Sequence, residues 1–185
     1  MNRTKHVALV ALVALVACDS RPSRGADTAA EPPADTPVSW TVDAQGIGRV
    51  RTGITVAQLG EALGAEVKPV YDFNPSCTHV TPPGLPGGVR LMIVDDTVAR
   101  VEVDSAGILT AEGAGVGDTE SSVILLYQGR VEVQPHKYTG PTGHYLVVTP
   151  PDDTLHRLIF ETDGERILRY RAGRIPAVQF VEGCA

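Results

Sequence analysis

Two histidines and two tyrosines lie within ten residues of this 185-residue chain, on either side of a Gly-Pro dipeptide. Their side chains combine apolar area with polar tips, which suits both partner contact and metal ligation. The candidate residues of this stretch are His136, Lys137, Tyr138, His144 and Tyr145. Because apolar segments flank the stretch, we favour a solvent-exposed β-turn first, a partner-contact loop second, and a metal or catalytic site last.

Five arginines near the C-terminus form a second candidate: Arg157, Arg166, Arg169, Arg171 and Arg174. Side chains alternate between the two faces of a strand, so Arg169 and Arg171 share one face while Leu168 and Tyr170 point the other way. Three acidic residues lie close by in the sequence. We therefore interpret this region as a solvent-exposed sheet face, with an anion site or a site for an acidic partner as the alternative.

Recognisable catalytic motifs are absent from the sequence. There is no Gly-x-Ser-x-Gly, no His-Glu-x-x-His and no histidine pair at ligand spacing on a convincing helix. The glycine-rich residues 113–117 precede a predicted helix, where exposed amides can bind phosphate. The equivalent helix start earlier in the chain has only Gly53, so we interpret residues 113–117 as a helix lead-in. We assign no catalytic residue, metal ligand or cofactor.

The N-terminus has the pattern of a secretory signal. Arg3 and Lys5 precede an 11-residue apolar run, residues 7–17, which at about 1.5 Å per residue is too short to cross a bilayer core of about 30 Å. The run ends in Leu15-Val16-Ala17-Cys18, which resembles the bacterial lipobox. The resemblance implies cleavage after residue 17, lipid attachment at Cys18 and anchoring outside the cytoplasm. An ordinary signal peptide with a chance cysteine is the alternative.

Charge and composition narrow the possible partners. Without residues 1–17 the chain has 14 basic and 22 acidic residues and a net charge of -8, which argues against a nucleic-acid partner because phosphate binding needs clustered basic residues. The expected location is the bacterial cell envelope, facing the periplasm or the cell exterior. Asp19 resembles the inner-membrane retention signal of enteric bacteria, but the choice between inner and outer membrane stays open.

The mature chain divides into a tether and one domain. Residues 18–37 form the lipidated N-terminus and a segment with almost nothing apolar larger than alanine, which predicts a disordered tether. Residues 38–185 have the usual size of a single domain with one core.

An internal repeat organises that domain into halves at about 38–106 and 107–185. Residues 53–64 align with 117–129, and Val-Thr-Pro-Pro at 80–83 recurs at 148–151. Two short helices are predicted. The first covers residues 55–63, with a Thr55–Gln58 capping box and Gly64 as its stop; the second covers 119–128, with Asp118 or Thr119 as its cap and Gly129 as its stop.

Strand-like segments surround both helices. They are residues 40–50, 66–71, 89–94 and 98–103 in the first half, and 108–112, 131–133, 145–148, 155–162 and 166–170 in the second. One helix per half cannot cover both faces of a sheet. The predicted fold is α+β: two tandem αβββ-like repeats forming a largely antiparallel sheet with two short helices on one face.

The duplicated Gly-x-Thr or Gly-Asp-Thr helix entry, followed by a strand meander, resembles two groups of proteins. One comprises the SmpA/OmlA-type envelope lipoproteins, which carry one such unit. The other comprises the secreted β-lactamase inhibitor proteins, which carry two. Neither group is enzymatic, so the resemblance implies a binding module that uses its sheet face or loops.

Two cysteines remain once Cys18 is assigned to the lipid. Cys77 and Cys184 are an even pair in an oxidising compartment, which predicts a disulfide. Its expected role is to attach a C-terminal strand, residues 177–181, to the first half. The alternative is a redox-active pair, but there is no Cys-x-x-Cys spacing to support it.

These observations lead to two functional hypotheses. The favoured one is a membrane-anchored, non-enzymatic lipoprotein whose domain binds an envelope protein through the loop at 136–145 and the strand that carries Arg169 and Arg171. The alternative is an envelope enzyme or small-ligand carrier with its site near His136, Lys137 and His144.

Overall fold

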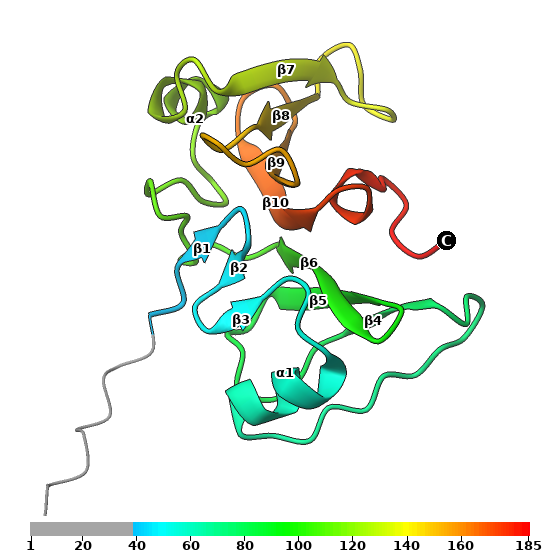
Figure 1. Ribbon diagram of the computed structural model, residues 1–185. Helices are drawn as coiled ribbons and strands as arrows, with labels where there is room; N and C mark the ends of the chain where they lie inside the picture. The colour runs from blue at the N-terminus through cyan, green and yellow to red at the C-terminus, as the bar shows by residue number, and fades with distance from the viewer. Residues whose placement is uncertain (1–38) are drawn as a thin grey trace, which may run out of the picture. The chain divides into compact units, whose positions relative to one another are not determined.

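The structure is a computed structural model that describes residues 39–185, so the predicted signal peptide, Cys18 and the whole of the predicted tether lie outside the described residues. The described part mixes helices with mostly antiparallel strands (Figure 1), which confirms the α+β class. The helices are α1 (Val56–Leu63), α2 (Glu120–Leu126) and the short 3-10 helix η1 (Ala177–Gln179). None of them is long and apolar enough to cross a membrane.

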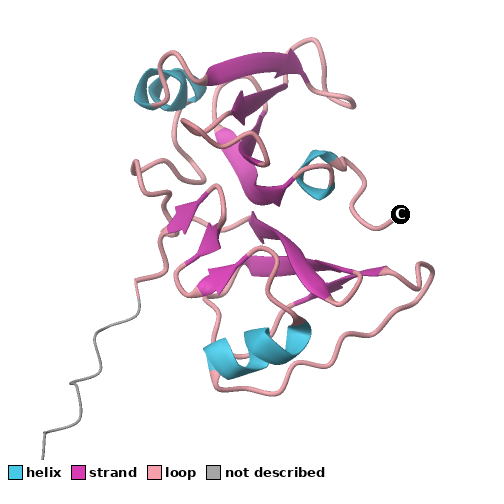
Figure 2. Cartoon of the chain, in the orientation of Figure 1, coloured by secondary structure: helices cyan, strands magenta, loops and turns pink. Residues whose placement is uncertain are grey.

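Ten strands are assigned within residues 39–185. They are β1 (Val42–Asp43), β2 (Gly46–Ile47), β3 (Val50–Arg51), β4 (Cys77–Val80), β5 (Val89–Val94), β6 (Thr97–Val103), β7 (Val131–Pro135), β8 (His144–Val148), β9 (His156–Thr162) and β10 (Ile167–Arg174). The first three form a small separate sheet. The other seven form one sheet in the order β4-β5-β6-β10-β9-β8-β7, and all neighbours are antiparallel. Figure 2 shows the strands in magenta and the helices in cyan.

The central pair, β6 and β10, joins the two halves of the sequence. Val103 pairs with Tyr170 and Glu102 pairs with Arg171. Alternation along each strand then assigns these pairs to opposite faces. Val103 and Tyr170 belong to the main apolar core, whereas Glu102 and Arg171 lie on the charged face described below.

The core lies between one face of this sheet and both helices. Val56 and Leu59 of α1 and Val123 of α2 belong to the same buried cluster as the inward residues of the strands. At its centre the Phe160 ring lies 5.7 Å from the Tyr127 ring and 5.3 Å from the Tyr170 ring, in tilted arrangements favourable for aromatic pairs. Both helices therefore cover the same face of the seven-stranded sheet. The opposite face is contacted by the C-terminal segment instead.

The predicted capping residues begin both helices. The Thr55 side chain accepts a hydrogen bond from Gln58 N, and the Gln58 side chain accepts one from Thr55 N, which confirms the capping box. Gly64 ends α1 in the left-handed region, at φ 63°. Thr119 caps α2.

The stop predicted at Gly129 is wrong, because α2 ends at Leu126. The next residue, Tyr127, is fully buried, and its hydroxyl forms hydrogen bonds with Thr110 and Glu112. These long-range contacts fix Tyr127 in the core, where it serves as the helix C-cap rather than as part of a further turn.

Two predicted strands are not formed. The segment 66–71 contains Pro69, which has no N–H to donate to a ladder, and the Val70 carbonyl instead accepts from the Thr78 hydroxyl. The strand that precedes the first Thr-Pro-Pro is β4, residues 77–80, which the sequence patterns did not identify. The predicted C-terminal strand at 177–181 begins instead as η1, directly after Pro176.

Two further segments are less regular than predicted. Residues 40–50 form parts of three two-residue strands. Residues 108–112 make only isolated bridges, because Thr110 N bonds to Ala114 O and Gly113 N to Thr110 O in a local turn. Both segments still contribute buried side chains to the core, including Ile47 and Ile108.

Candidate functional site

The face of the seven-stranded sheet opposite the helices carries charged side chains at its centre. Burying a charge is costly unless it is paired and hydrogen-bonded. Here two glutamates, Glu102 and Glu161, each receive two arginines and one histidine. These two clusters make up the candidate site.

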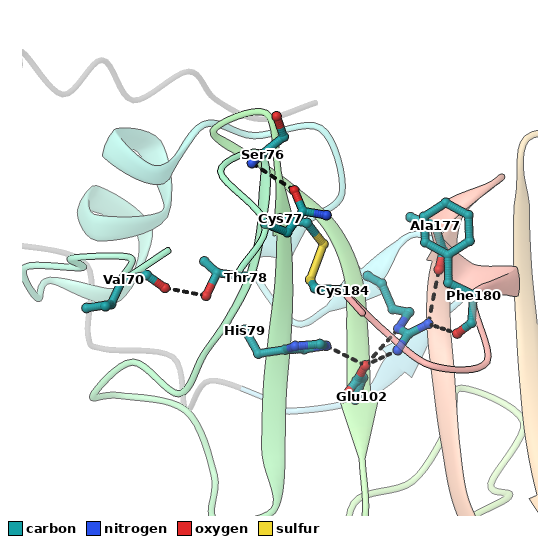
Figure 3. Close-up of a disulfide and its surroundings, with 11 residues drawn as sticks. Val70, Ser76, Cys77, Thr78, His79, Glu102, Ala177, Phe180 and Cys184 are labelled. Carbon is teal, nitrogen blue, oxygen red and sulfur yellow. Dashed lines mark hydrogen bonds and ion pairs between the residues drawn. A yellow bond between two sulfur atoms is a disulfide. The ribbon is translucent and has the colours of Figure 1, made fainter. Parts of the chain in front are cut away.

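The first cluster centres on Glu102 of β6. Arg100 Nε lies 2.8 Å from Glu102 Oε1, Arg90 Nε lies 2.7 Å from Oε2, and His79 Nε2 lies 3.1 Å from Oε1. Burial raises the pKa of Glu102, but the hydrogen bond to His79 and the charge of Arg100 outweigh it, so the pKa lies well below its ordinary value. Glu102 is therefore ionised at neutral pH. Figure 3 shows His79 and Glu102 pointing toward each other.

The second cluster centres on Glu161 of β9. Arg169 Nε lies 2.6 Å from Glu161 Oε2, His136 Nε2 lies 3.4 Å from the same oxygen, and Arg171 pairs with Oε1. Burial raises the pKa of Glu161, but the charges of Arg171 and Arg169 and the hydrogen bond to His136 lower it more, so the net shift is downward. The Glu161 side chain is only 5% exposed.

The C-terminal segment covers part of this charged face. Arg100 donates to the carbonyls of Ala177 and Phe180, and Arg171 donates to the carbonyl of Val178. The end of the segment is attached to β4, because Cys77 and Cys184 lie at disulfide distance, with their sulfurs 2.06 Å apart (Figure 3). The pairing agrees with the predicted disulfide, although the attached segment is not the expected strand.

A glycine lets the C-terminal segment approach the first cluster closely. Gly183 has φ 69°, and a Cβ there would lie 2.9 Å from His79 Cε1. A side chain at 183 would therefore be strained by its backbone conformation and would also press against the His79 ring.

The structure brings together part of the predicted contact surface. His136 and Tyr145 stack with ring centroids 4.4 Å apart, and the Arg171 guanidinium lies 5.6 Å from the Tyr145 ring. Tyr145 is buried, and its hydroxyl has no hydrogen-bond partner among the described residues. Because Glu161 binds both His136 and Arg169, the loop and the arginine strand meet at one carboxylate.

Lys137 and Tyr138 lie at the border of this surface. Both hydrogen-bond to Glu182 of the C-terminal segment. The bond raises the pKa of Lys137 and that of Tyr138 and lowers that of Glu182. The loop is thus joined to the C-terminal segment as well as to the sheet.

His144 lies apart from the other candidates, on the helix side of the sheet. Its Nδ1 lies 3.0 Å from both carboxylate oxygens of Glu120, at the start of α2. Along β8 it alternates with Tyr145, which faces the charged side. His136 and His144 therefore cannot act on one ligand.

The loop at 136–145 and the strand that carries Arg169 and Arg171 were both predicted to be solvent-exposed, but some of their side chains are buried. The side chains of Arg171 and His136 are 8% and 9% exposed, whereas Arg169 is 60% exposed. The cluster around Glu102 was not identified as a candidate. The sequence did contain one signal for this cluster. Arg100 and Glu102 lie two residues apart on a predicted strand, so their side chains share one face of the sheet.

In both clusters the glutamate holds the arginine guanidinium groups in fixed orientations. Such groups can donate hydrogen bonds to acceptor atoms of a binding partner. Within residues 39–185 no group of three or more histidine, cysteine or acidic side chains is placed to hold a metal ion. No protein-family model matches the chain, and no curated protein or solved structure matches it. A functional conclusion must therefore come from the site itself.

Proposed function

We propose that this protein is a lipid-anchored lipoprotein of the bacterial cell envelope whose folded domain binds another envelope protein and catalyses no reaction. The observation that carries the proposal is the meeting of His136 and Arg169 at Glu161, which unites the loop and the strand into one surface. Tyr138 and Arg169, each 60% exposed, lie on it. Tyrosine and arginine are among the residue types that most often anchor protein interfaces.

Anchoring rests on the N-terminal sequence. The short apolar run ahead of Leu15-Val16-Ala17-Cys18 supports signal-peptide cleavage and acylation of Cys18. Two or more acyl chains give stable membrane attachment. Replacing Cys18 with serine should abolish the lipid mass and release the chain from the membrane fraction. A Cys18→Ser chain that keeps its lipid and still needs detergent for extraction would refute the anchor.

We also propose that the domain consists of two tandem αβββ-like repeats, as its resemblance to the SmpA/OmlA-type lipoproteins and the β-lactamase inhibitor proteins implies. In each half, two backbone N–H groups near the start of the helix donate to a β-hairpin, which is β5–β6 for α1 and β9–β10 for α2. One accepting carbonyl lies at the start of the hairpin's second strand, and the other lies in the hairpin's turn. The matched bonds are Gly53 N to Val98 O and Gly117 N to Ile167 O, and Val56 N to Asp96 O and Glu120 N to Glu165 O.

The sheet supports the duplication further. Each hairpin has a register shift, between Met92 and Ile93 in one and between Ile167 and Arg169 in the other. The strand order also places β5 and β9 symmetrically about the central β6–β10 pair. A binding surface at the junction of two such units is the arrangement that the proposal requires.

The partner can be sought by site-specific photo-cross-linking in bacterial cells that express the full chain. A photoreactive amino acid at position 138 should give an adduct with one envelope protein. The same amino acid at position 155, where Leu155 is 53% exposed outside this surface, should not give that adduct. Equal adducts at both positions, or none at position 138, would contradict the proposed surface.

The alternative, an envelope enzyme or a small-ligand carrier near His136, Lys137 and His144, gains no support from the geometry because the two histidines lie on opposite faces. An activity of the purified chain that disappears in the His136→Ala variant would nevertheless replace our proposal with that one.

A further inference from the structure

A cavity of about 320 Å³ opens on the charged face between the two glutamate clusters. Residues of β5, β6 and β10 line it, and the C-terminal segment forms one wall through residues 181–183. Its volume is near the lower end of the range for ligand pockets, about 300 to 1,000 Å³. It is thus large enough for one or two residues of a peptide and too small for a whole helix or strand.

Two arginines present unused donors at this cavity. Arg169 binds Glu161 through Nε, and within residues 39–185 neither of its Nη atoms has a hydrogen-bond partner. Arg90 binds Glu102 through Nε and Nη2, which leaves Nη1 without a partner in the same part of the chain. Both side chains are more than half exposed, at 60% and 55%. In each case the buried glutamate fixes one edge of the guanidinium and leaves N–H groups free.

The other two arginines of the cavity have structural partners. Arg100 and Arg171 are buried, pair with Glu102 and Glu161, and donate to main-chain carbonyls of the C-terminal segment. They are therefore not the groups that a ligand would recruit. This division assigns ligand recognition to Arg169 and Arg90.

The carboxylates that line the cavity restrict the ligand further. Glu102 and Glu161 are occupied by arginines, and Glu182 is occupied by Lys137 and Tyr138. Asp104 accepts only from Ser105, at 3.3 Å, among the described residues. Its oxygens can therefore accept a further N–H group.

Four arginines and four carboxylates line the cavity, so it does not have the excess of positive charge that a phosphate dianion requires. A single carboxylate is a closer match, because its two oxygens fit the planar fork of an arginine. A peptide segment also brings main-chain N–H groups that Asp104 can accept. The chemistry is that of a glutamate or aspartate residue within a polypeptide.

We propose that this cavity binds an acidic side chain of a partner protein, with Arg169 and Arg90 donating to its carboxylate and Asp104 accepting from the adjoining main chain. The inference rests on the proposed binding function and names the chemistry of the partner. Glu102 and Glu161 act as positioning residues, because they hold the arginines without touching the ligand.

The test is a titration of the full chain with a defined peptide. The probe is the capped hexapeptide Ser-Gly-Glu-Glu-Gly-Ser, and the matched control replaces both of its glutamates with glutamine. Binding is followed by NMR through the Nε–H signals of the arginines. The glutamate peptide should shift the signals of Arg169 and Arg90, and the glutamine peptide should not.

Two variants of Arg169 distinguish recognition by the planar guanidinium group from attraction by positive charge alone. Arg169→Gln should weaken binding of the glutamate peptide by about tenfold or more, since it removes hydrogen bonds between two charged groups. Arg169→Lys keeps the charge but loses the fork, so it should also weaken binding. Arg51→Gln, which removes an arginine paired with Asp43 outside the cavity, should leave binding unchanged.

Several outcomes would overturn the inference: equal binding of both peptides, unchanged binding by Arg169→Gln, or tighter binding when phosphoserines replace the two glutamates. In cells, an envelope partner that cross-links equally to the wild type and to Arg169→Gln would overturn the cavity assignment and leave the proposed function standing. Specific peptide binding without any cross-linked partner would instead contradict the proposed function.

Discussion

Replacing Glu102 with glutamine should destabilise the folded domain strongly. Arg100 is only 5% exposed and Glu102 only 13% exposed, so the substitution leaves a buried guanidinium without its counter-charge. Removing one partner of a buried ion pair typically costs about 3 to 5 kcal/mol. Glutamine keeps one acceptor oxygen, and Arg100 keeps its bonds to Ala177 and Phe180. We therefore expect the lower end of that range, about 3 kcal/mol.

The measurement is urea-induced unfolding of the full chain with its disulfide intact, followed by circular dichroism. Thermal unfolding should show a matching decrease in Tm of about 6 to 12 °C, given about 2 to 4 °C per kcal/mol for a domain of this size. The control is Asp43→Asn, which breaks the ion pair with Arg51. Both side chains of that pair are at least 36% exposed, so the expected loss is about 0 to 1 kcal/mol. Equal losses for Glu102→Gln and Asp43→Asn would refute the reasoning from burial.

Three further predictions address the disulfide, the pH dependence and two tyrosines. Alkylation of the unfolded, unreduced chain should label neither Cys77 nor Cys184, and replacing both with serine should lower the free energy of unfolding by up to about 4 to 5 kcal/mol, because the bond closes a 107-residue separation. Labelling of both cysteines would refute the bond. The folded-state pKa of Glu161 lies below its ordinary value of 4.5, so the unfolded chain takes up the proton first and stability should fall as the pH drops below about 4.5. Urea titrations across that range should show a weaker dependence for Glu161→Gln, and an unchanged dependence would contradict the assignment. Tyr170→Phe should cost about 1 to 2 kcal/mol because the Tyr170 hydroxyl donates to Ile108 O in the core, whereas Tyr145→Phe should cost nothing because that hydroxyl is buried without a partner. The opposite order of stabilities in the same unfolding assay would disprove this comparison.

Local sequence signals predicted the features that depend on few neighbouring residues. The caps at Thr55 and Thr119 formed as expected, because a cap needs only a side-chain acceptor and an amide three residues later. Alternation placed Arg169 and Arg171 on one face for a similar reason. The pairing of Cys77 with Cys184 followed from counting the cysteines left after Cys18 was assigned to the lipid.

Tertiary structure decided where those features meet. The Glu102 cluster draws His79, Arg90 and Arg100 from three strands, and their proximity depends on strand order and register, which no local pattern contains. For the same reason the sequence placed His136 and His144 together, whereas hairpin register put them on opposite faces.

The C-terminal segment shows the same division between local and long-range causes. Its residues read as a strand, but buried arginines bind its carbonyls and a disulfide attaches its end to β4. Two of the residues that make those contacts, Arg100 and Cys77, lie more than 70 positions before the segment in the sequence. The sequence alone thus determined the helix starts, the faces of individual strands and the disulfide pair, while long-range packing determined which charged side chains share a cavity.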